Sequence, residues 1–224
     1  MDIFEREFKV VNKELERSTQ LKEEYIFRAS IDKFERIDDQ LVKFEFQHDL
    51  RHEIDIRGRM IEYPKIHQAE FYIYSAPKAN YLLVNGEETS VKFLVGKLFH
   101  MMKDSEFKQI IYNRLSLNND TFLELLYNDA LEINASWWKK VDQDLKSVFL
   151  SGNLKDKDGE QEIFKLIKEK ASDISYATYL SEIIGYNLAI TRKNFSITAS
   201  KKEVNVGSLI KYFRDTIHPL LQTT

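Results

Sequence analysis

The chain has 224 residues, of which 43% are hydrophobic and 12% aromatic, so it can bury a core in one large or two small domains. It has no cysteine, which excludes disulfides, thiol catalysis and thiolate zinc sites and favours a reducing, cytoplasmic setting. No stretch has the apolar length of a membrane span or the pattern of a signal peptide, so we expect a soluble protein.

The N-terminal part is expected to begin with an amphipathic helix and to continue as strands. Apolar side chains recur at helical spacing among mixed charges from Asp2 to about Glu24. The period then changes to two, because apolar and polar residues alternate over 25–31, 42–47 and 53–57. This alternation is typical of half-buried strands.

The stretch 69–102 has the clearest local pattern in the chain. Phe71–Tyr74 and Tyr81–Val84 indicate two antiparallel strands, and apolar residues between Val91 and Met102 then follow helical spacing. Gly96 lies inside this predicted helix at a cost of about 1 kcal/mol relative to Ala, so we expect its missing side chain to admit a close backbone neighbour. With the earlier strands, this unit predicts an antiparallel sheet of about five strands, covered on one face by helices.

Beyond Asp104 the pattern is mainly helical. Apolar spacing predicts helices over 107–115, 121–131, 138–149, 163–171 and 174–184. The polar run 153–160, NLKDKDGE, is expected to be a flexible loop that trypsin cuts first. The chain then returns to strands, with a hairpin made of Tyr186–Thr191 and Phe195–Ser200, and ends in a helix over Val206–Leu220.

Together these patterns predict an α+β fold. The N-terminal half is expected to be a mainly antiparallel β-sheet with covering helices, and the C-terminal half to be helical, ending in a β-hairpin and a helix. Two modules follow, a β-rich α+β module over 1–103 and a mainly helical module over 104–224, with the option that both pack as a single domain.

Histidines and carboxylates cluster once, in the segment 48–55. His48 and His52 are four residues apart, a spacing that places both imidazoles on one face, and with Asp55 they could bind a divalent metal and activate water. The alternative is that they are solvent-facing residues of a strand pair. H-x-x-x-H without the H-E-x-x-H order or a third matched ligand is a weak signal, so we assign no metal and no cofactor.

Trp137 and Trp138 are adjacent, inside a predicted helix. At helical spacing only one indole can face the core, so the other is expected to be half-exposed. Packing against a neighbouring loop of the same chain is the favoured interpretation, because tryptophan is usually covered in a folded protein. A partner surface is the alternative.

The C-terminal segment from Gly185 onwards carries six bases against two acids, a net charge of +4. The bases are Arg192, Lys193, Lys201, Lys202, Lys211 and Arg214. Tyr186, Phe195 and Tyr212 lie between them, a combination that can contact phosphates and stack on bases. The alternative, which so modest a charge favours, is a solvated or protein-facing surface.

Several catalytic classes have no motif in this chain. It contains no glycine-rich phosphate loop and no G-x-S-x-G, and the turn at Asp156–Gly159 lacks the ligand positions of a calcium loop. We therefore expect a non-catalytic binding or assembly subunit of a larger cytoplasmic complex, which binds a protein partner or a second copy, with nucleic acid as a further candidate and no membrane. The alternative is a metal-dependent phosphodiester hydrolase that uses His48, His52 and Asp55.

Overall fold

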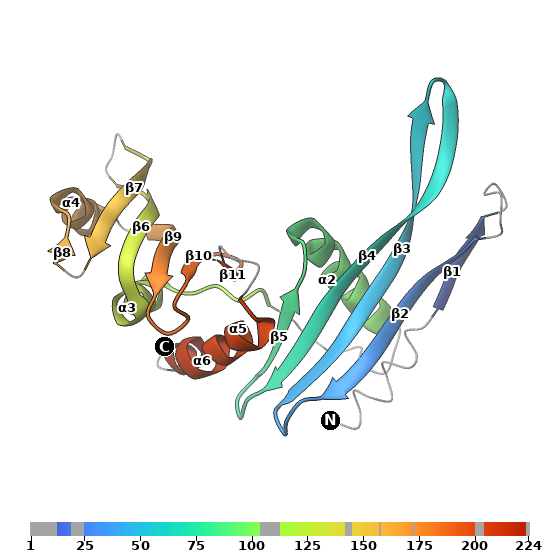
Figure 1. Cartoon of the computed structure of the whole chain (residues 1–224), viewed down its shortest axis with the longest axis horizontal. Helices are drawn as coiled ribbons and strands as arrows, with labels where there is room; N and C mark the ends of the chain where they lie inside the picture. Colours follow the sequence, from blue (N-terminus) through green and yellow to red (C-terminus); the bar gives the residue numbers. More distant parts are fainter. Residues whose placement is uncertain are drawn as a thin grey trace. The chain divides into compact units, whose positions relative to one another are not determined.

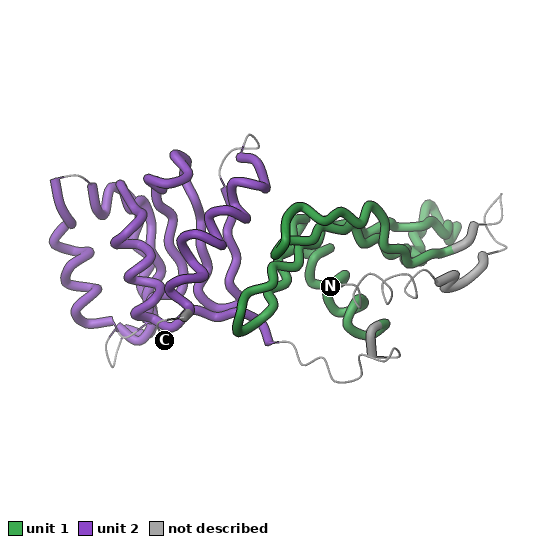
Figure 2. Tube along the Cα trace, turned by 90° about the horizontal axis from the view of Figure 1, so that it is seen from below, with its two compact units in different colours: residues 1–111 green, residues 112–224 purple. Residues whose placement is uncertain are grey.

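The structure is a computed structural model in which the chain divides into two compact units, Met1–Ile111 (unit 1) and Tyr112–Thr224 (unit 2) (Figure 2). The structure describes residues 13–18, 25–103, 113–141, 145–156, 158–171, 173–199 and 204–222. Within these ranges, no helix has the length and apolar character needed to cross a membrane.

Unit 1 is built on a five-stranded sheet in which each strand pairs antiparallel with the next one along the chain (Figure 1). The strands are β1 (Lys13–Ser18), β2 (Tyr25–Arg36), β3 (Leu41–Ile56), β4 (Arg59–Ser75) and β5 (Asn80–Asn85). The antiparallel sheet predicted for this half is confirmed. The predicted N-terminal helix is wrong over 13–18, where the chain is the edge strand β1, and the rest of that helix lies outside the described residues.

Helix α2 (Glu88–Lys103) covers one face of this sheet. Its Leu94 and Leu98 pack on the inward side chains of β3 and β4, among them Phe44, Phe46 and Phe71. The close neighbour expected at Gly96 is not there, since a side chain added at that position would meet no atom within 4 Å. The tight glycine is Gly86, where an added Cβ would lie 3.1 Å from the Cβ of Ala69.

The hairpin of β3 and β4 is much longer than the rest of the sheet. Its two strands stay in register from Leu41–Tyr74 to Ile56–Arg59, and Arg57 and Gly58, both at positive φ, close it. Among the described residues, β2 pairs with β3 only as far as His48, and β5 pairs with β4 only as far as Glu70. The remaining part, residues 49–66, is a two-stranded ribbon that projects beyond the other strands, and we call it the arm (Figure 1).

Unit 2 is built on a six-stranded antiparallel sheet in the order β11-β10-β9-β6-β7-β8. Its strands are β6 (Ala130–Lys139), β7 (Ser147–Asp156), β8 (Gly159–Glu160), β9 (Asp173–Ser181), β10 (Asn187–Thr191) and β11 (Ser196–Ala199). The helices predicted over 138–149 and 174–184 are therefore wrong in the described residues, and so is the expectation of a mainly helical C-terminal half, because a six-stranded sheet forms the centre of this unit. The segment 174–184 is rich in aromatic and β-branched residues, and in β9 buried and half-buried side chains alternate with a period close to two.

The helices of unit 2 lie on one face of this sheet. They are α3 (Asn119–Asp129), α4 (Glu162–Lys170) and a C-terminal helix made of α5 (Val206–Tyr212), the π-helical turn η2 (Phe213–Ile217) and α6 (His218–Gln222). Trp138 of β6 packs against Phe164 of α4 with 5.8 Å between ring centroids, and Tyr179 of β9 bonds to Tyr212 of α5. These helices and the β10–β11 hairpin confirm the corresponding predictions.

Two further predictions for this half fail. The segment 113–118 is not helical, and the rest of the helix predicted over 107–115 lies outside the described residues. The expected flexible loop at 153–160 is largely ordered, because it holds the end of β7 and the short strand β8. Lys155, an expected trypsin site, donates a hydrogen bond to the backbone oxygen of Ala130 at 3.1 Å, whereas Lys157 lies outside the described residues.

Candidate functional site

The arm has two chemically different faces, which follow from its register. Residues directly opposite each other on paired strands point to the same side of the ribbon, and every second residue does so along each strand. One face of the arm therefore carries Leu50, His52, Ile54 and Ile56 from β3 and Arg59, Ile61, Tyr63 and Lys65 from β4. We call it the apolar face, and its Ile54, Ile56 and Ile61 are 46%, 49% and 45% exposed.

The apolar face continues the core-facing side of the sheet. The cross-strand pairs Phe46–Ala69, His48–His67 and Leu50–Lys65 follow one another along the hairpin at intervals of two residues, so all point to the side on which α2 packs. Phe46 and Ala69 are buried in the core, whereas Ile54 and Ile61, further along the same stripe, are half-exposed. The hydrophobic surface thus extends past the part of the hairpin that α2 covers.

His48 and His67 mark the boundary between core and arm. Both are buried, and both rings contact Phe93 of α2, with centroid separations of 5.2 and 4.8 Å. His67 Nδ1 lies 3.0 Å from the hydroxyl of Ser90, and His48 Nδ1 lies 2.9 Å from the backbone oxygen of Asp49. Burial lowers the pKa of both imidazoles, which favours their neutral forms.

The opposite face of the arm is acidic. Glu53 and Glu62 lie directly opposite each other, and Asp49 and Asp55 share their side of the ribbon. Arg51, on the same side, forms an ion pair with Glu62 at 3.6 Å. Like charges placed opposite each other weaken a strand pair. The same face also carries Met60, Pro64 and Ile66, of which Met60 and Ile66 are 62% and 53% exposed. The two faces of the ribbon therefore differ chiefly in charge, because only this one carries carboxylates.

The residues of the hypothetical metal site are not gathered in one place. His48 and His52 point to the same side, but four residues of extended strand separate their Cα atoms by about 13 Å. His52 lies against Tyr63, with 5.6 Å between ring centroids. Asp55 points to the acidic face and accepts a hydrogen bond from the backbone N–H of Gly58 at 2.7 Å. In the described ranges, no three His, Cys, Asp or Glu side chains are close enough to hold an ion.

The structure describes four of the six residues of the predicted basic surface, and one of these four is buried. Arg192 is buried and has a structural environment, because its guanidinium donates to the backbone oxygens of Ile174 and Leu117 and forms an ion pair with Asp173. Arg214 is half-buried and donates to Asp215 at 3.1 Å. The remaining members are placed as follows: Lys193 is exposed at the β10–β11 turn, Lys211 is exposed on α5, and Lys201 and Lys202 lie outside the described residues.

A buried carboxylate that the sequence patterns did not indicate connects three elements of unit 2. Asp129, at the end of α3, is 1% exposed and accepts hydrogen bonds from Ser181 Oγ, the Ile183 N–H and the Tyr212 hydroxyl. Tyr212 also bonds to Tyr179, and burial raises the pKa of both phenols. A carboxylate in the last turn of a helix interacts unfavourably with the helix dipole. The position of Asp129 at the end of α3 was therefore the available sequence signal that its carboxylate has partners on other elements.

The two tryptophans divide as expected, although on a strand rather than a helix. Trp138 is fully buried, and its indole N–H donates to Ser136 Oγ at 2.8 Å. Trp137 is 45% exposed on the opposite side of β6, where its ring meets that of Phe149 at 6.1 Å. Strand alternation separates the two indoles as effectively as helical spacing would.

No protein-family model, no curated protein and no solved structure matches the chain. Inferences about function therefore depend on the surfaces described above, of which the arm departs most from what a folded chain needs for its own stability.

Proposed function

We propose that this protein is a non-catalytic binding or assembly subunit of a larger complex, and that the apolar face of the arm is its contact surface. The observation that carries the proposal is the row of half-exposed aliphatic and aromatic side chains on a ribbon that pairs with no other described strand beyond His48. Strand β2 contacts the base of this ribbon, where the Arg28 N–H donates to Asp49 and Arg51 lies over the Phe27 ring. A two-stranded hairpin alone is marginally stable in water, and contiguous exposed apolar surface is typical of protein interaction sites.

The chemistry of the apolar face indicates the kind of partner. Besides its apolar residues, this face carries Arg59, Lys65 and His52, and it has no carboxylate. We infer a partner protein with an apolar groove bordered by acidic residues. Completing the burial of Ile54, Ile56, Ile61 and their neighbours contributes about 1 kcal/mol for each half-exposed side chain, so roughly 5 kcal/mol is available to offset the cost of association.

The cytoplasmic location of such a complex is part of the proposal and is supported by the absence of cysteine from the chain. The metal-dependent hydrolase is not favoured by the geometry, because His48 and His52 are about 13 Å apart along the strand and Asp55 points to the other side. Nucleic-acid contact is a separate question, since the arm offers an apolar rather than a basic surface.

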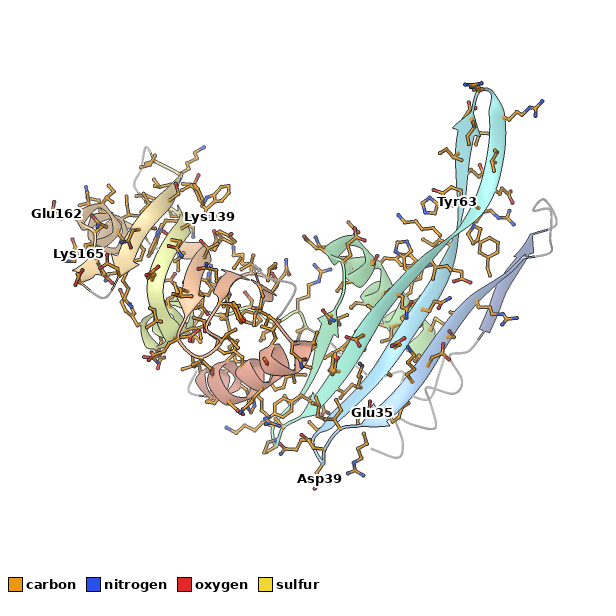
Figure 3. The ribbon with its side chains drawn as sticks, viewed as in Figure 1. Glu35, Asp39, Tyr63, Lys139, Glu162 and Lys165 are labelled. Carbon is orange, nitrogen blue, oxygen red and sulfur yellow. The ribbon has the colours of Figure 1, made fainter. Side chains whose placement is uncertain are left out.

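The proposal can be tested by site-specific photocrosslinking in the native cells. Tyr63 is replaced by benzoylphenylalanine, which places the reactive ketone on the apolar face (Figure 3 labels this residue), and Glu62 is replaced in the same way as the control on the acidic face. We expect a discrete adduct from position 63 that disappears in the Ile54→Thr/Ile61→Thr background, and none from position 62. Equal yields from both positions, or no adduct from position 63, would count against a contact at the apolar face.

A further inference from the structure

The face of the unit 2 sheet opposite its helices carries a row of aromatic side chains on three neighbouring strands. Trp137 of β6 is directly opposite Phe149 of β7 on one side and Tyr176 of β9 on the other. Trp137 and Phe149 are 45% and 55% exposed, and Tyr176 is half-buried. Because adjacent strands are about 4.8 Å apart, these three residues, the aromatic row, span roughly 10 Å across the sheet.

The surroundings of the aromatic row are small and polar. On the same face, the row continues into Thr191 of β10 and Ser196 of β11, whose hydroxyls bond to each other at 2.7 Å. The next row of side chains on this face consists of Ser151, Ala135, Thr178, Ala189 and Thr198. Neither row contains a carboxylate or a large aliphatic side chain, so a flat ligand can approach the rings without steric or electrostatic obstruction.

Positive charge borders the aromatic row at one edge of the sheet. Lys139 ends β6 and Lys140 follows it, Lys146 precedes β7, and Lys193 lies in the β10–β11 turn, all at the edge where the aromatic row lies. All four are exposed, and no described residue forms an ion pair with them, although Lys139 is directly opposite Asp173, whose carboxylate pairs with Arg192. We call them the edge lysines. In the sequence, the loop between β6 and β7 adds Asp142 and Asp144, which leaves a local charge of +2 from four bases and two acids.

We propose that this face of unit 2 binds single-stranded nucleic acid, with bases stacked on the aromatic row and phosphates held by the edge lysines. Aromatic side chains on an open sheet face can each accept an unpaired base, and basic side chains beside them follow the backbone. A row that spans three strands offers places for two or three bases. The hydroxyls of the adjacent row can bond to sugar or phosphate oxygens.

A single strand fits this surface better than the other polyanionic partners. In a duplex, the faces of the bases are stacked on each other, so only phosphates could reach the edge lysines and the exposed rings would remain unused. A protein partner would be expected to find larger aliphatic side chains around the rings, as on the arm. The inference does not depend on the function proposed for the arm, because it concerns different residues in a different unit.

Binding can be measured on the full-length chain with fluorescein-labelled oligothymidylate and oligouridylate of about 16 nucleotides, with a labelled duplex of the same length as the comparison. At low salt, we expect at least one single strand to bind more tightly than the duplex. Binding should also quench the fluorescence of Trp137, since Trp138 is buried and out of reach. Trp137→Thr should weaken single-strand binding roughly 10-fold or more, whereas Trp137→Phe, which retains a ring, should restore most of it.

The contribution of the lysines is tested with a pair of charge-matched variants. Lys139→Gln/Lys146→Gln should weaken binding and flatten the salt dependence by about 1.4 in log–log slope, because each phosphate contact to a single strand contributes about 0.7. Lys165→Gln/Lys170→Gln removes the same charge from α4, on the other side of the sheet, and should leave binding unchanged (Figure 3 labels Lys139 and Lys165).

Three results would overturn the proposal. The first is the absence of single-strand binding at low salt. The second is equal binding of single strand and duplex, which would indicate contact with phosphates only. The third is binding that Trp137→Thr does not change, provided that the variant unfolds at the same temperature as the wild type. Phe149→Thr, at a position that is 55% exposed, repeats the test at a second ring in case the first variant is poorly folded.

Discussion

Replacing residues 51–64 of the arm by the dipeptide Arg-Gly is expected to leave unit 1 folded. The design retains the native turn, because the cross-strand pair Leu50–Lys65 has the same hydrogen-bonding type as Ile56–Arg59, which the native Arg57-Gly58 turn closes. Pair types alternate along an antiparallel ladder, and these two pairs are an even number of residues apart. The shortened hairpin therefore keeps its register and the orientation of every core side chain.

The structure sets the size of the effect. Most of the removed side chains are exposed, although that of Glu62 is only 9% exposed, and one described contact that links the segment to the rest of the unit is Arg51, which lies 5.8 Å from the centre of the Phe27 ring. Such a contact contributes about 0.5–1 kcal/mol. Removing the ribbon also removes its own hydrogen bonds, but this loss is offset because the entropy cost of ordering the ribbon is removed with them. We therefore expect unit 1 to lose about 1 kcal/mol of unfolding free energy, a small part of the 5–15 kcal/mol typical of a domain.

Urea unfolding followed by far-ultraviolet circular dichroism measures this change. Both tryptophans are in unit 2, so their fluorescence reports the unfolding of that unit separately and serves as an internal control. A loss of more than about 3 kcal/mol from unit 1 would refute the reasoning, because it would make the arm part of the core rather than a surface displayed for a partner.

Two further predictions concern the packing of α2 against the sheet. Burial lowers the folded-state pKa values of His48 and His67, so their contribution to stability is present above the unfolded pKa of about 6.5 and is lost as the pH falls below it. Urea unfolding should therefore show unit 1 to be less stable at about pH 5 than at about pH 7.5. The variant His48→Phe should reduce this difference in stability. An unchanged difference in that variant would contradict the assignment. Gly96→Ala should stabilise unit 1 by about 1 kcal/mol, whereas Gly86→Ala should destabilise it, because the added Cβ would lie 3.1 Å from side-chain atoms of Ala69 and Val91. The opposite order of thermal unfolding temperatures would show that these packing distances do not decide stability.

The first half of the fold was largely predictable because its local signals agree. In β3 and β4, alternation, β-propensity and turn residues all favour strands, and the helical spacing from Val91 onwards follows a clear stop at Asn85-Gly86. The length of the hairpin was not predictable in the same way. The alternation at 53–57 indicates a strand, but nothing local says whether a neighbouring strand or helix will cover its apolar side.

In the second half of the chain, strands were predicted to be helices where the same apolar residues fit both the helical period of 3.6 and the strand period of two. Trp138, Val141, Leu145 and Val148 fit a helical stripe, yet Trp138 and Val148 are cross-strand partners on β6 and β7. Aromatic and β-branched enrichment was the signal that could have decided between helix and strand.

The candidate basic surface shows a further limit of sequence reasoning, because a sequence gives the number of charges but not their positions in space. Arg192 was counted as a phosphate contact, whereas tertiary packing buries its guanidinium against backbone oxygens of Leu117 and Ile174 and beside Asp173. The edge lysines and the aromatic row come from strands that are distant in sequence, so only the order of strands in the sheet brings them to one edge.

The central claim, that the apolar face of the arm holds a partner, is tested most directly by two double variants on opposite sides of the same ribbon. Ile54→Thr/Ile61→Thr replaces an exposed pair on the apolar face with residues that retain β-branching, and Glu53→Thr/Glu62→Thr makes the same change at the neighbouring pair on the acidic face. The measurement is the native mass of each tagged chain, purified gently from its own cells and followed by mass photometry. We predict that the wild type and the Glu53/Glu62 variant remain in the same assembly, whether with another protein or with a second copy. The Ile54/Ile61 variant should lose roughly 2 kcal/mol of binding, about 30-fold in affinity, and appear mainly as the free chain at the nanomolar concentrations of the measurement. An Ile54/Ile61 variant that keeps the wild-type mass, or a wild type that is found only as the free chain, would contradict the account.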